Sequence, residues 1–314
     1  MEAIATRDAY GQALKKLGEL HSEVVVMDAD LSKSTKTADF AKAFPERFFD
    51  MGIAEQNLMA VAAGLAASGK VVFASSFAVF ATGRAFEQIR NSIAYANLNV
   101  KICATHAGVT VGEDGGSHQS IEDIAIMRAI PNLKVIVPCD GPSTLKAIQA
   151  VYDEPGPCYI RLGRSKVAVV HEDDMDFAIG KAIRLRAGKD VGIIACGLMV
   201  QEALKAADLL AEKGIAATVV DLHTIKPLDK ELIVQVARET GCLVTAEEHS
   251  ILGGLGGAVA ELVSSEWPVP IARVGVEDKF GQSGSPEELL EFYGLNARSI
   301  FEQAQNTIAK KSKK

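Results

Sequence analysis

Residues 55–74 read EQNLMAVAAGLAASGKVVFA and combine the two patterns that recur along the chain. From Glu55 to Ala67 the apolar residues follow helical spacing, and 71–74 is a short apolar run of the length of a buried strand. Strand-like runs and helix-period segments keep alternating on both sides of this stretch. Such alternation predicts a parallel sheet covered by helices.

The alternation extends over two separate blocks of the chain. In the first block, strands are expected at 24–27, 71–74, 100–105, 135–137 and 158–162, and helices at 55–67, 83–96, 120–129 and 142–152. A polar stretch at 171–176 interrupts the pattern, which restarts with strands at 191–195 and 217–221 and helices at 200–213 and 229–238. A chain of 314 residues exceeds the size at which one core stops growing. We therefore expect an α/β protein of two domains, 1–172 and 173–314, each a mostly parallel sheet covered by helices.

Composition excludes several classes of partner and location. The chain has 33 basic and 40 acidic residues, a net charge of −7, which is unfavourable for binding a polyanionic backbone, so no nucleic-acid partner is expected. No apolar run approaches the length needed to span a membrane. The five cysteines are scattered singly, without a C-x-x-C pair, as is usual in a reducing compartment. These features predict a cytoplasmic protein.

Glu55 is the first candidate functional residue. It lies at the turn between an extended segment and a helix, where open α/β sheets place ligands. Its apolar neighbours Ile53, Leu58 and Met59 would exclude water from the carboxylate and suit it to hold and return a proton. The alternative is a first-turn glutamate that only stabilises the helix dipole. The residues alone leave both interpretations open.

The loop at 106–119, HAGVTVGEDGGSHQ, contains two histidines and two acids among four glycines. Glycines let the backbone approach a ligand closely, and His or Asp side chains at the end of a strand can bind sugar hydroxyls. A divalent metal site and a plain surface turn are the competing interpretations. Because no helical His pair or C-x-x-C frame accompanies the loop, no residue of this chain is assigned to a metal.

Two further pairs could contact a ligand. Phe77 and Phe80 follow a predicted strand and could flank a flat heterocycle, although core packing is a common reason for such a pair. Arg161 and Arg164 end another predicted strand. A guanidinium there could bind a substrate phosphate, or simply face water.

Six segments, taken together and in order, resemble the transketolase family. They are Ala5 to Arg7, Asp28 to Leu31, Gly52 to Asn57, Ser76 to Arg90, Gly112 to Gln119 and His223 to Asp229. The resemblance covers nearly the whole chain, and we know of no other family that combines the glutamate motif, the G-E-D-G-x-x-H-Q loop and the T-I-K-P-L-D turn.

The resemblance implies a role for each matching residue. Glu55 falls on the family's glutamate that hydrogen-bonds the aminopyrimidine ring of thiamine diphosphate and drives formation of the reactive ylide, and His118 is counted with it as catalytic. The implied cofactor contacts are Asp30, Glu55, Phe77 and Phe80, the ketose hydroxyl contacts are Asp114 and His118, and the sugar-phosphate contacts are Arg7, Ser34, His106 and Arg164. Arg164 is preferred to Arg161 because it has the family's spacing after Pro157.

One family element is absent from this sequence. Family members carry an earlier domain with a G-D-G…N segment, whose Asp and Asn hold the divalent metal that bridges the cofactor diphosphate. The closest string here, Cys139-Asp140-Gly141, has no suitable asparagine after it. The resemblance therefore implies that a partner chain, an N-terminal transketolase subunit, holds the diphosphate and a divalent cation, Mg or Ca. It also implies association into a dimer or heterotetramer.

The expected activity is metal-dependent transfer of a two-carbon ketol unit between sugar phosphates, as in the pentose phosphate pathway. The first alternative is the β-subunit of a 2-oxoacid dehydrogenase, which also lacks the diphosphate domain but binds no sugar phosphate. Deoxyxylulose phosphate synthase has a similar loop but is normally one long chain. A non-catalytic scaffold with the same fold is the alternative from another class, and intact Glu55, Asp114 and His118 argue against it.

Overall fold

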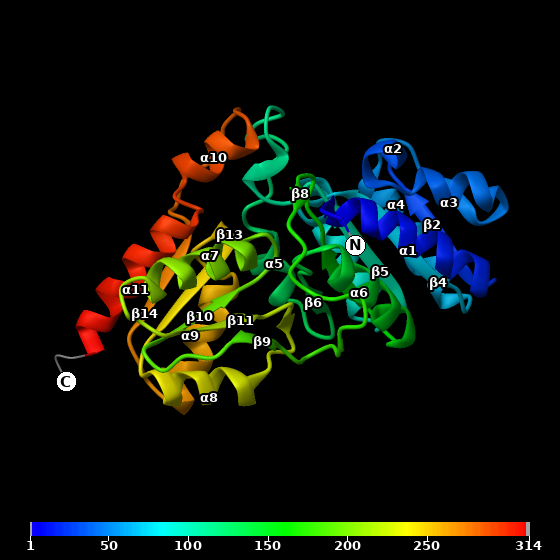
Figure 1. The fold of residues 1–314 in the computed structure, drawn as a ribbon. Helices are drawn as coiled ribbons and strands as arrows, with labels where there is room; N and C mark the ends of the chain where they lie inside the picture. Colours follow the sequence, from blue (N-terminus) through cyan, green and yellow to red (C-terminus); the bar gives the residue numbers. More distant parts are fainter. Residues whose placement is uncertain (1, 312–314) are drawn as a thin grey trace.

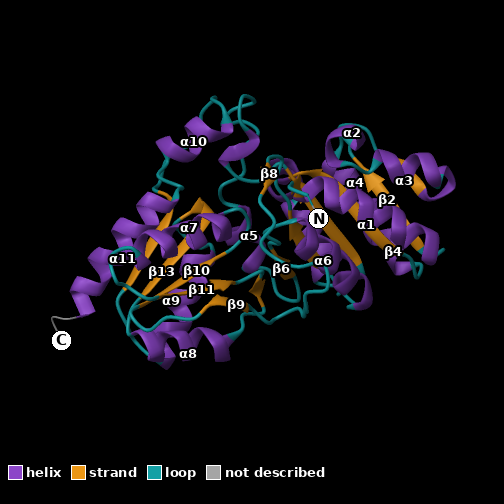
Figure 2. Ribbon diagram, in the orientation of Figure 1, coloured by secondary structure: helices purple, strands orange, loops and turns teal. Residues whose placement is uncertain are grey.

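A computed structural model describes residues 2–311 as two α/β lobes that lie side by side (Figures 1 and 2). The helices and 3-10 or π-helical segments of the first lobe are α1 (Thr6–Leu20), α2 (Ser32–Thr35), α3 (Ala38–Ala43), η1 (Pro45–Arg47), α4 (Glu55–Ala67), η2 (Phe80–Arg84), η3 (Gln88–Ala94), η4 (Val109–Val111), α5 (Asp123–Arg128) and α6 (Gly141–Asp153). Those of the second lobe are α7 (Met199–Ala211), α8 (Lys230–Thr240), α9 (Leu255–Glu266), α10 (Pro286–Phe292) and α11 (Ala297–Lys311).

The first sheet has seven strands in the order β12-β6-β7-β5-β4-β2-β3. They are β2 (Val24–Asp28), β3 (Phe48–Asp50), β4 (Val71–Phe77), β5 (Val100–Thr105), β6 (Lys134–Ile136), β7 (Cys158–Arg161) and β12 (Thr224–Lys226). All neighbours pair in parallel except β12, which comes from the second half of the chain and runs antiparallel to β6. A two-stranded ribbon of β1 (Ile4–Ala5) and β8 (Lys166–Val167) stands beside this sheet.

The second sheet has five strands in the order β14-β13-β10-β11-β9. They are β9 (Ile183–Arg186), β10 (Val191–Ala195), β11 (Ala217–Asp221), β13 (Leu243–Ser250) and β14 (Ile271–Val276). Only β9 is antiparallel to its neighbour. The predicted fold class, two mostly parallel sheets covered by helices, is confirmed. The boundary at residue 173 stays a prediction, and the structure adds that β12, from beyond it, joins the first sheet.

Alternating side chains of the strands build cores on both faces. In β2, Val24 and Val26 pack toward α1 and α6, whereas Val25 and Met27 pack toward α4. The cluster that contains Met27 continues into the second lobe as far as α8 and α9, so the two lobes share apolar core. None of the helices described is long and apolar enough to cross a membrane.

The segment expected as one helix at 83–96 differs from that expectation. It consists mainly of two π-helical segments, η2 and η3, in which bonds such as Tyr95 N–H to Arg90 O (2.9 Å) span five residues. Helical spacing of apolar residues does not distinguish an α-helix from a π-helical segment, because both bury one face. π-helical turns are frequent at functional sites, and η2 begins at Phe80.

Candidate active site

The carboxyl ends of β2, β4 and β5 meet at one edge of the first sheet, because these strands are parallel. Phe77 ends β4, and His106 follows β5. At the end of β2, Asp28 accepts hydrogen bonds from Thr35 Oγ1 (2.6 Å) and Thr37 Oγ1 (2.9 Å). Burial raises the pKa of Asp28 to about 6. These bonds fix the short turn α2, which carries Ser34.

Glu55 begins α4 and is 4% exposed. Its Oε1 lies 3.4 Å from Nη1 of Arg84, the last residue of η2. Leu58 and Met59 are buried as expected, but Ile53 is 77% exposed and does not cover the carboxylate. The expectation that Ile53 excludes water from Glu55 is therefore wrong, because its side chain lies outside the core before the helix has begun. Sequence reasoning also missed Arg84, whose only local signal is its position four residues after Phe80.

Aromatic rings form a continuous surface beside this ion pair. Phe77 and Phe80 stack with centroids 6.0 Å apart and planes 13° apart. The His106 ring stacks on Phe77 at 3.8 Å, and the His118 ring meets Phe80 edge-on at 5.2 Å. Arg84 lies over the Phe80 ring at 4.2 Å, so this guanidinium contacts both the aromatic surface and Glu55.

Arg7, Ser34 and His106 come together at the far end of the aromatic surface. Arg7 Nη1 donates to Ser34 O (3.1 Å) and to His106 Nε2 (3.0 Å). Arginine can only donate, so Nε2 is the acceptor and the imidazole proton resides on Nδ1, which donates to Thr105 Oγ1 (2.8 Å). Burial, together with the charges of Arg7 and Arg164, lowers the pKa of His106 to about 3. His106 is therefore neutral.

Arg161 and Arg164 have different environments. Arg161 is 6% exposed and forms a buried ion pair in which its Nε donates to Asp123 Oδ2 (2.8 Å). Its Nη2 also donates to Glu248 O (2.9 Å). Arg164 is 36% exposed and pairs with Glu113 (2.9 Å). Burial lowers the pKa of Arg7, and the nearby charge of Arg164 adds to this effect. Of the two arginines, only Arg164 is accessible to a ligand at this edge.

The glycine-rich loop runs from His106 over η4 to Gln119 and is held by the second lobe. Gln119 is buried, and its Nε2 donates to Gln282 O (2.9 Å). A Cβ at Gly116 would lie 2.6 Å from Gly281 O, so the two segments are in close backbone contact. In Figure 1, α10 lies against this loop, in agreement with its contacts to η4. His118 is half-buried, whereas Asp114 is exposed.

Asp30 is exposed and lies beside the turn that leads to Glu55. Asp50 Oδ1 accepts from both Asp30 N–H (3.0 Å) and Gly52 N–H (2.9 Å), which ties the end of β2 to that turn. The structure thus places five of the predicted residues in one row in which each contacts the next: Glu55, Phe80, Phe77, His106 and Arg7. Glu55 and Phe80 are joined through Arg84, which contacts both.

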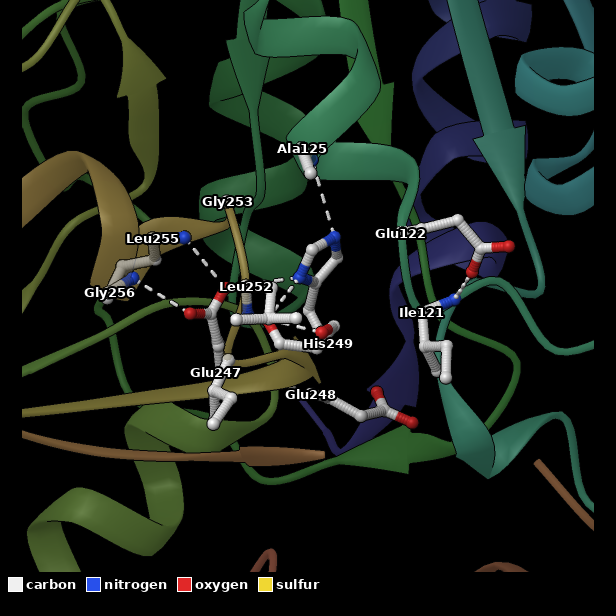
Figure 3. A network of polar contacts seen from close by, with 12 residues as sticks. Ile121, Glu122, Ala125, Glu247, Glu248, His249, Leu252, Gly253, Leu255 and Gly256 are labelled. Atoms are coloured by element: carbon white, nitrogen blue, oxygen red, sulfur yellow. Dashed lines mark hydrogen bonds and ion pairs between the residues drawn. The ribbon is translucent and has the colours of Figure 1, made fainter. Parts of the chain in front are cut away.

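A second polar network connects the lobes behind the loop (Figure 3). Thr110 N–H donates to Glu248 Oε1 (2.7 Å), and Ala125 N–H donates to His249 Nε2 (3.3 Å). Glu247 caps α9 by accepting from Leu255 N–H (2.7 Å) and Gly256 N–H (2.8 Å). Burial raises the pKa of Glu248 to about 7. Sequence analysis did not single out these residues, because their partners lie far away in the chain.

The open edge of this α/β fold offers a buried carboxylate, an aromatic face and a cationic cluster in one row, which are groups that can bind a flat, charged ligand. Two family models match the chain in order, "Transketolase, pyrimidine binding domain" at residues 2–169 and "Transketolase, C-terminal domain" at residues 180–300. The chain therefore belongs to the transketolase family of thiamine diphosphate enzymes.

Relatives match over nearly the whole chain. The "Putative transketolase C-terminal section" of Methanocaldococcus jannaschii is 52% identical over 307 residues, 97% of this chain and 96% of the relative. A 6-deoxy-6-sulfo-D-fructose transketolase subunit of a Clostridium species is 42% identical over 306 residues, 98% of this chain and 95% of the relative. A solved "Split gene transketolase, inactive beta4 tetramer" is 56% identical, with a TM-score of 0.90 over 98% of this chain and 99% of that chain. The chain is accordingly a transketolase subunit of the split type, and the 2-oxoacid dehydrogenase alternative is not favoured.

Proposed function

We propose that this chain supplies the pyrimidine-binding and sugar-binding side of a ketol-transfer site, which a partner chain completes with the diphosphate-binding side. The observation that carries the proposal is the row of contacts from Glu55 through Arg84 and the two phenylalanines to His106 and Arg7. In this row a carboxylate, a flat apolar surface and a cationic cluster follow one another.

These residues fit the aminopyrimidine end of thiamine diphosphate. A flat heterocycle with a basic ring nitrogen needs an aromatic face and a carboxyl group at its edge. Phe77 and Phe80 offer the face, and Glu55, held by Arg84, offers the carboxylate. When bound, the cofactor would supply a thiazolium that stabilises the negative charge left when a two-carbon unit is cut from a ketose. Glu55 would hold a proton at the ring nitrogen, and His118 would bind and exchange a proton at a substrate hydroxyl.

The cationic cluster fits the phosphate end of a sugar phosphate. Arg7 carries a buried Nε that has no hydrogen-bond partner within the described residues, and the half-buried Arg164 lies beside it. The neutral His106 orients Arg7, and Ser34 lies in the turn at the other side of the guanidinium. Asp114 and His118, on the loop between the aromatic surface and this cluster, would orient the hydroxyls of the donor. Sugar phosphates of the pentose phosphate type are the proposed substrates.

The proposed assembly is supported by the relatives described as a transketolase C-terminal section and as a split gene transketolase. We infer that residues 1–172 form the pyrimidine-binding domain and residues 173–314 the C-terminal domain, and that the partner holds the diphosphate and its Mg or Ca ion. The relative described as an inactive beta4 tetramer supports both self-association and inactivity without a partner. Five free, buried cysteines support a reducing, cytoplasmic location.

The direct test of the site is Glu55→Gln in the enzyme reconstituted with its partner. An amide can bond the ring nitrogen but cannot share a proton with it, so we expect a fold near that of wild type and a fall in turnover of about a hundredfold or more. Thiazolium deuterium exchange should fall in parallel. Glu87→Gln, an exposed change nearby on the same lobe, is the matched control. Wild-type exchange and turnover in Glu55→Gln would show that Glu55 only begins a helix.

A further inference from the structure

Three potential metal ligands converge outside the row of contacts from Glu55 to Arg7 described above. Cys139 follows β6, His171 lies in the segment between the two sheets, and Asp221 is the last residue of β11. All three side chains are buried. Their ligand atoms, one from each residue, all lie within 4.8 Å of one another. Cysteine thiolate, imidazole and carboxylate are all ligand types that bind Zn²⁺ in proteins.

Both other side chains point at the same carboxylate oxygen. Cys139 Sγ donates to Asp221 Oδ2 (3.4 Å), and His171 Nε2 lies 2.8 Å from it. The second oxygen, Asp221 Oδ1, is buried and has no hydrogen-bond partner among residues 2–311. Among residues 2–311, His171 is the only ion-pair partner recorded for this fully buried carboxylate. A buried carboxylate with an unpartnered oxygen is costly unless a cation compensates it.

His223, two residues beyond Asp221, provides a second unpartnered group. It is fully buried, its ring stacks on Phe177 at 4.1 Å, and its Nδ1 contacts Thr224 Oγ1 (3.0 Å). Its Nε2 has no hydrogen-bond partner in the part of the chain that the structure describes. Two orphaned buried polar atoms therefore occur within three residues of chain, which is unusual in a folded protein.

We propose that Cys139, His171 and Asp221 bind a Zn²⁺ ion that links the two lobes. On binding, the thiol proton of Cys139 and the Nε2 proton that His171 directs at Asp221 are released to solvent. The Zn²⁺ charge is then balanced by one thiolate and one carboxylate, and the neutral imidazole, with its proton on Nδ1, binds through the lone pair of Nε2. Tetrahedral ligands of Zn²⁺ lie about 3.3–3.7 Å apart. The observed 3.4 Å between Sγ and Oδ2 already fits, and the 2.8 Å between Nε2 and Oδ2 must open by about half an ångström.

The backbone around the ligands is already fixed. Asp140 Oδ2 accepts from His171 N–H (2.8 Å) and Val170 N–H (2.8 Å), while its Oδ1 caps α6 through Ser143 N–H (2.8 Å). The carboxylate of Asp140, the residue after Cys139, thereby holds the backbone of His171 close to Cys139. A metal ion at this place would tie the end of β6, the connecting segment and the end of β11.

The test measures zinc in the untagged full-length chain after dialysis against metal-free buffer. We expect roughly one zinc per chain in wild type and at least a tenfold lower content in Cys139→Ser and in His171→Gln. Cys242→Ser, a buried cysteine whose Sγ contacts Asp190 O, is the matched control and should keep the wild-type content. Because His171 lies in a connecting segment, His171→Gln keeps the test valid if Cys139→Ser does not fold.

A second readout identifies the ligands. Chelator-treated wild type titrated with Co²⁺ alone should develop the near-ultraviolet absorption of a cobalt–thiolate bond, and Cys139→Ser should not. A wild-type chain with less than about a tenth of a zinc per chain and no cobalt–thiolate band would overturn the proposal. The same is true if zinc content is equal in wild type, Cys139→Ser and His171→Gln. The three side chains would then form only a Cys–Asp–His hydrogen-bonded array.

Discussion

Arg161 ends β7 and Arg164 lies three residues later, yet their guanidinium groups face different environments. Arg161 is buried against Asp123 and bonds the backbone of the second lobe, whereas Arg164 stands beside Arg7 at the open edge. The sequence left open which of the two arginines could bind a substrate phosphate, and the answer depends on which side chain is buried. Burial depends on the strand register and on packing against the second lobe, and a spacing of three residues predicts neither.

Arg164→Ala should lower kcat/KM selectively for phosphorylated substrates. A hydrogen bond to a charged group contributes roughly 1.5–3 kcal/mol, so kcat/KM for a ketose phosphate should fall about ten- to a hundredfold. Hydroxypyruvate, which has no phosphate, should change much less. Arg298→Ala, on the exposed surface of α11, is the control. Equal losses on both substrates would indicate general damage and contradict a phosphate role.

Arg161→Ala should act on stability instead. Removing one member of a buried ion pair leaves an uncompensated charge on Asp123 and costs about 3–5 kcal/mol. Urea unfolding of the chain measures this cost. A variant as stable as wild type, with selective loss of phosphorylated substrates, would transfer the phosphate role from Arg164 to Arg161.

Glu248 should make stability depend on pH in a defined window. Its pKa is about 7 in the folded chain, against an ordinary value of 4.5, because burial disfavours the carboxylate. The native state therefore retains a proton that the unfolded state releases as the pH rises from 4.5 to about 7. This stabilising contribution is full below pH 4.5 and is lost by about pH 7, at a cost of about 3 kcal/mol.

Glu248→Gln cannot ionise and removes that dependence. The free energy of unfolding of the variant, relative to wild type, should rise by up to about 3 kcal/mol between about pH 5 and about pH 8. Urea unfolding at both pH values measures it. A difference that stays constant with pH would mean that Glu248 titrates alike in both states.

At the scale of elements, the glycine-rich loop depends on close contact with β13. Gly108 has φ +84°, and a Cβ there would lie 2.2 Å from the Glu248 carboxyl carbon. Gly69 has φ +92° but open space around it. An alanine would strain the backbone at both positions, but only at Gly108 would it also collide with a neighbouring side chain. Comparing the two substitutions therefore distinguishes backbone strain from steric contact.

Gly108→Ala should destabilise the chain more than Gly69→Ala, and only the first should lower turnover with every substrate. Each substitution costs about 1–3 kcal/mol for the left-handed backbone, and Gly108→Ala adds the displacement of Glu248 or of the loop. Unfolding midpoints and turnover of both reconstituted variants measure the difference. Equal effects would show that the loop tolerates movement away from β13.

Local patterns in the sequence predicted much of the fold and part of the site. The strands at 100–105, 191–195 and 217–221 match the structure residue for residue, because continuous apolar runs are the signature of buried parallel strands. Glu55 was predicted at the start of its helix, but Arg84 was not, since it reaches Glu55 from a π-helical segment 29 residues away. The Thr110–Glu248 and Gln119–Gln282 contacts span 138 and 163 residues. No local pattern encodes contacts of that range.

At the scale of the whole molecule, the candidate site lies at an open edge of the first lobe, and we infer that a second chain covers it. The residues of the row suit a heterocycle, a sugar and a phosphate, and the sequence contains no G-D-G…N segment to hold a diphosphate and its metal. According to this proposal, the chain supplies one side of an active site and a partner chain supplies the other.

The most direct test compares ketol transfer by the purified chain alone with that of the chain combined with a partner that carries the G-D-G…N segment. We predict no transfer by the chain alone, transfer dependent on thiamine diphosphate in the combined sample, and its loss when Glu55→Gln replaces wild type. Ketol transfer from a sugar phosphate by this chain without any partner would contradict the proposal of a shared site.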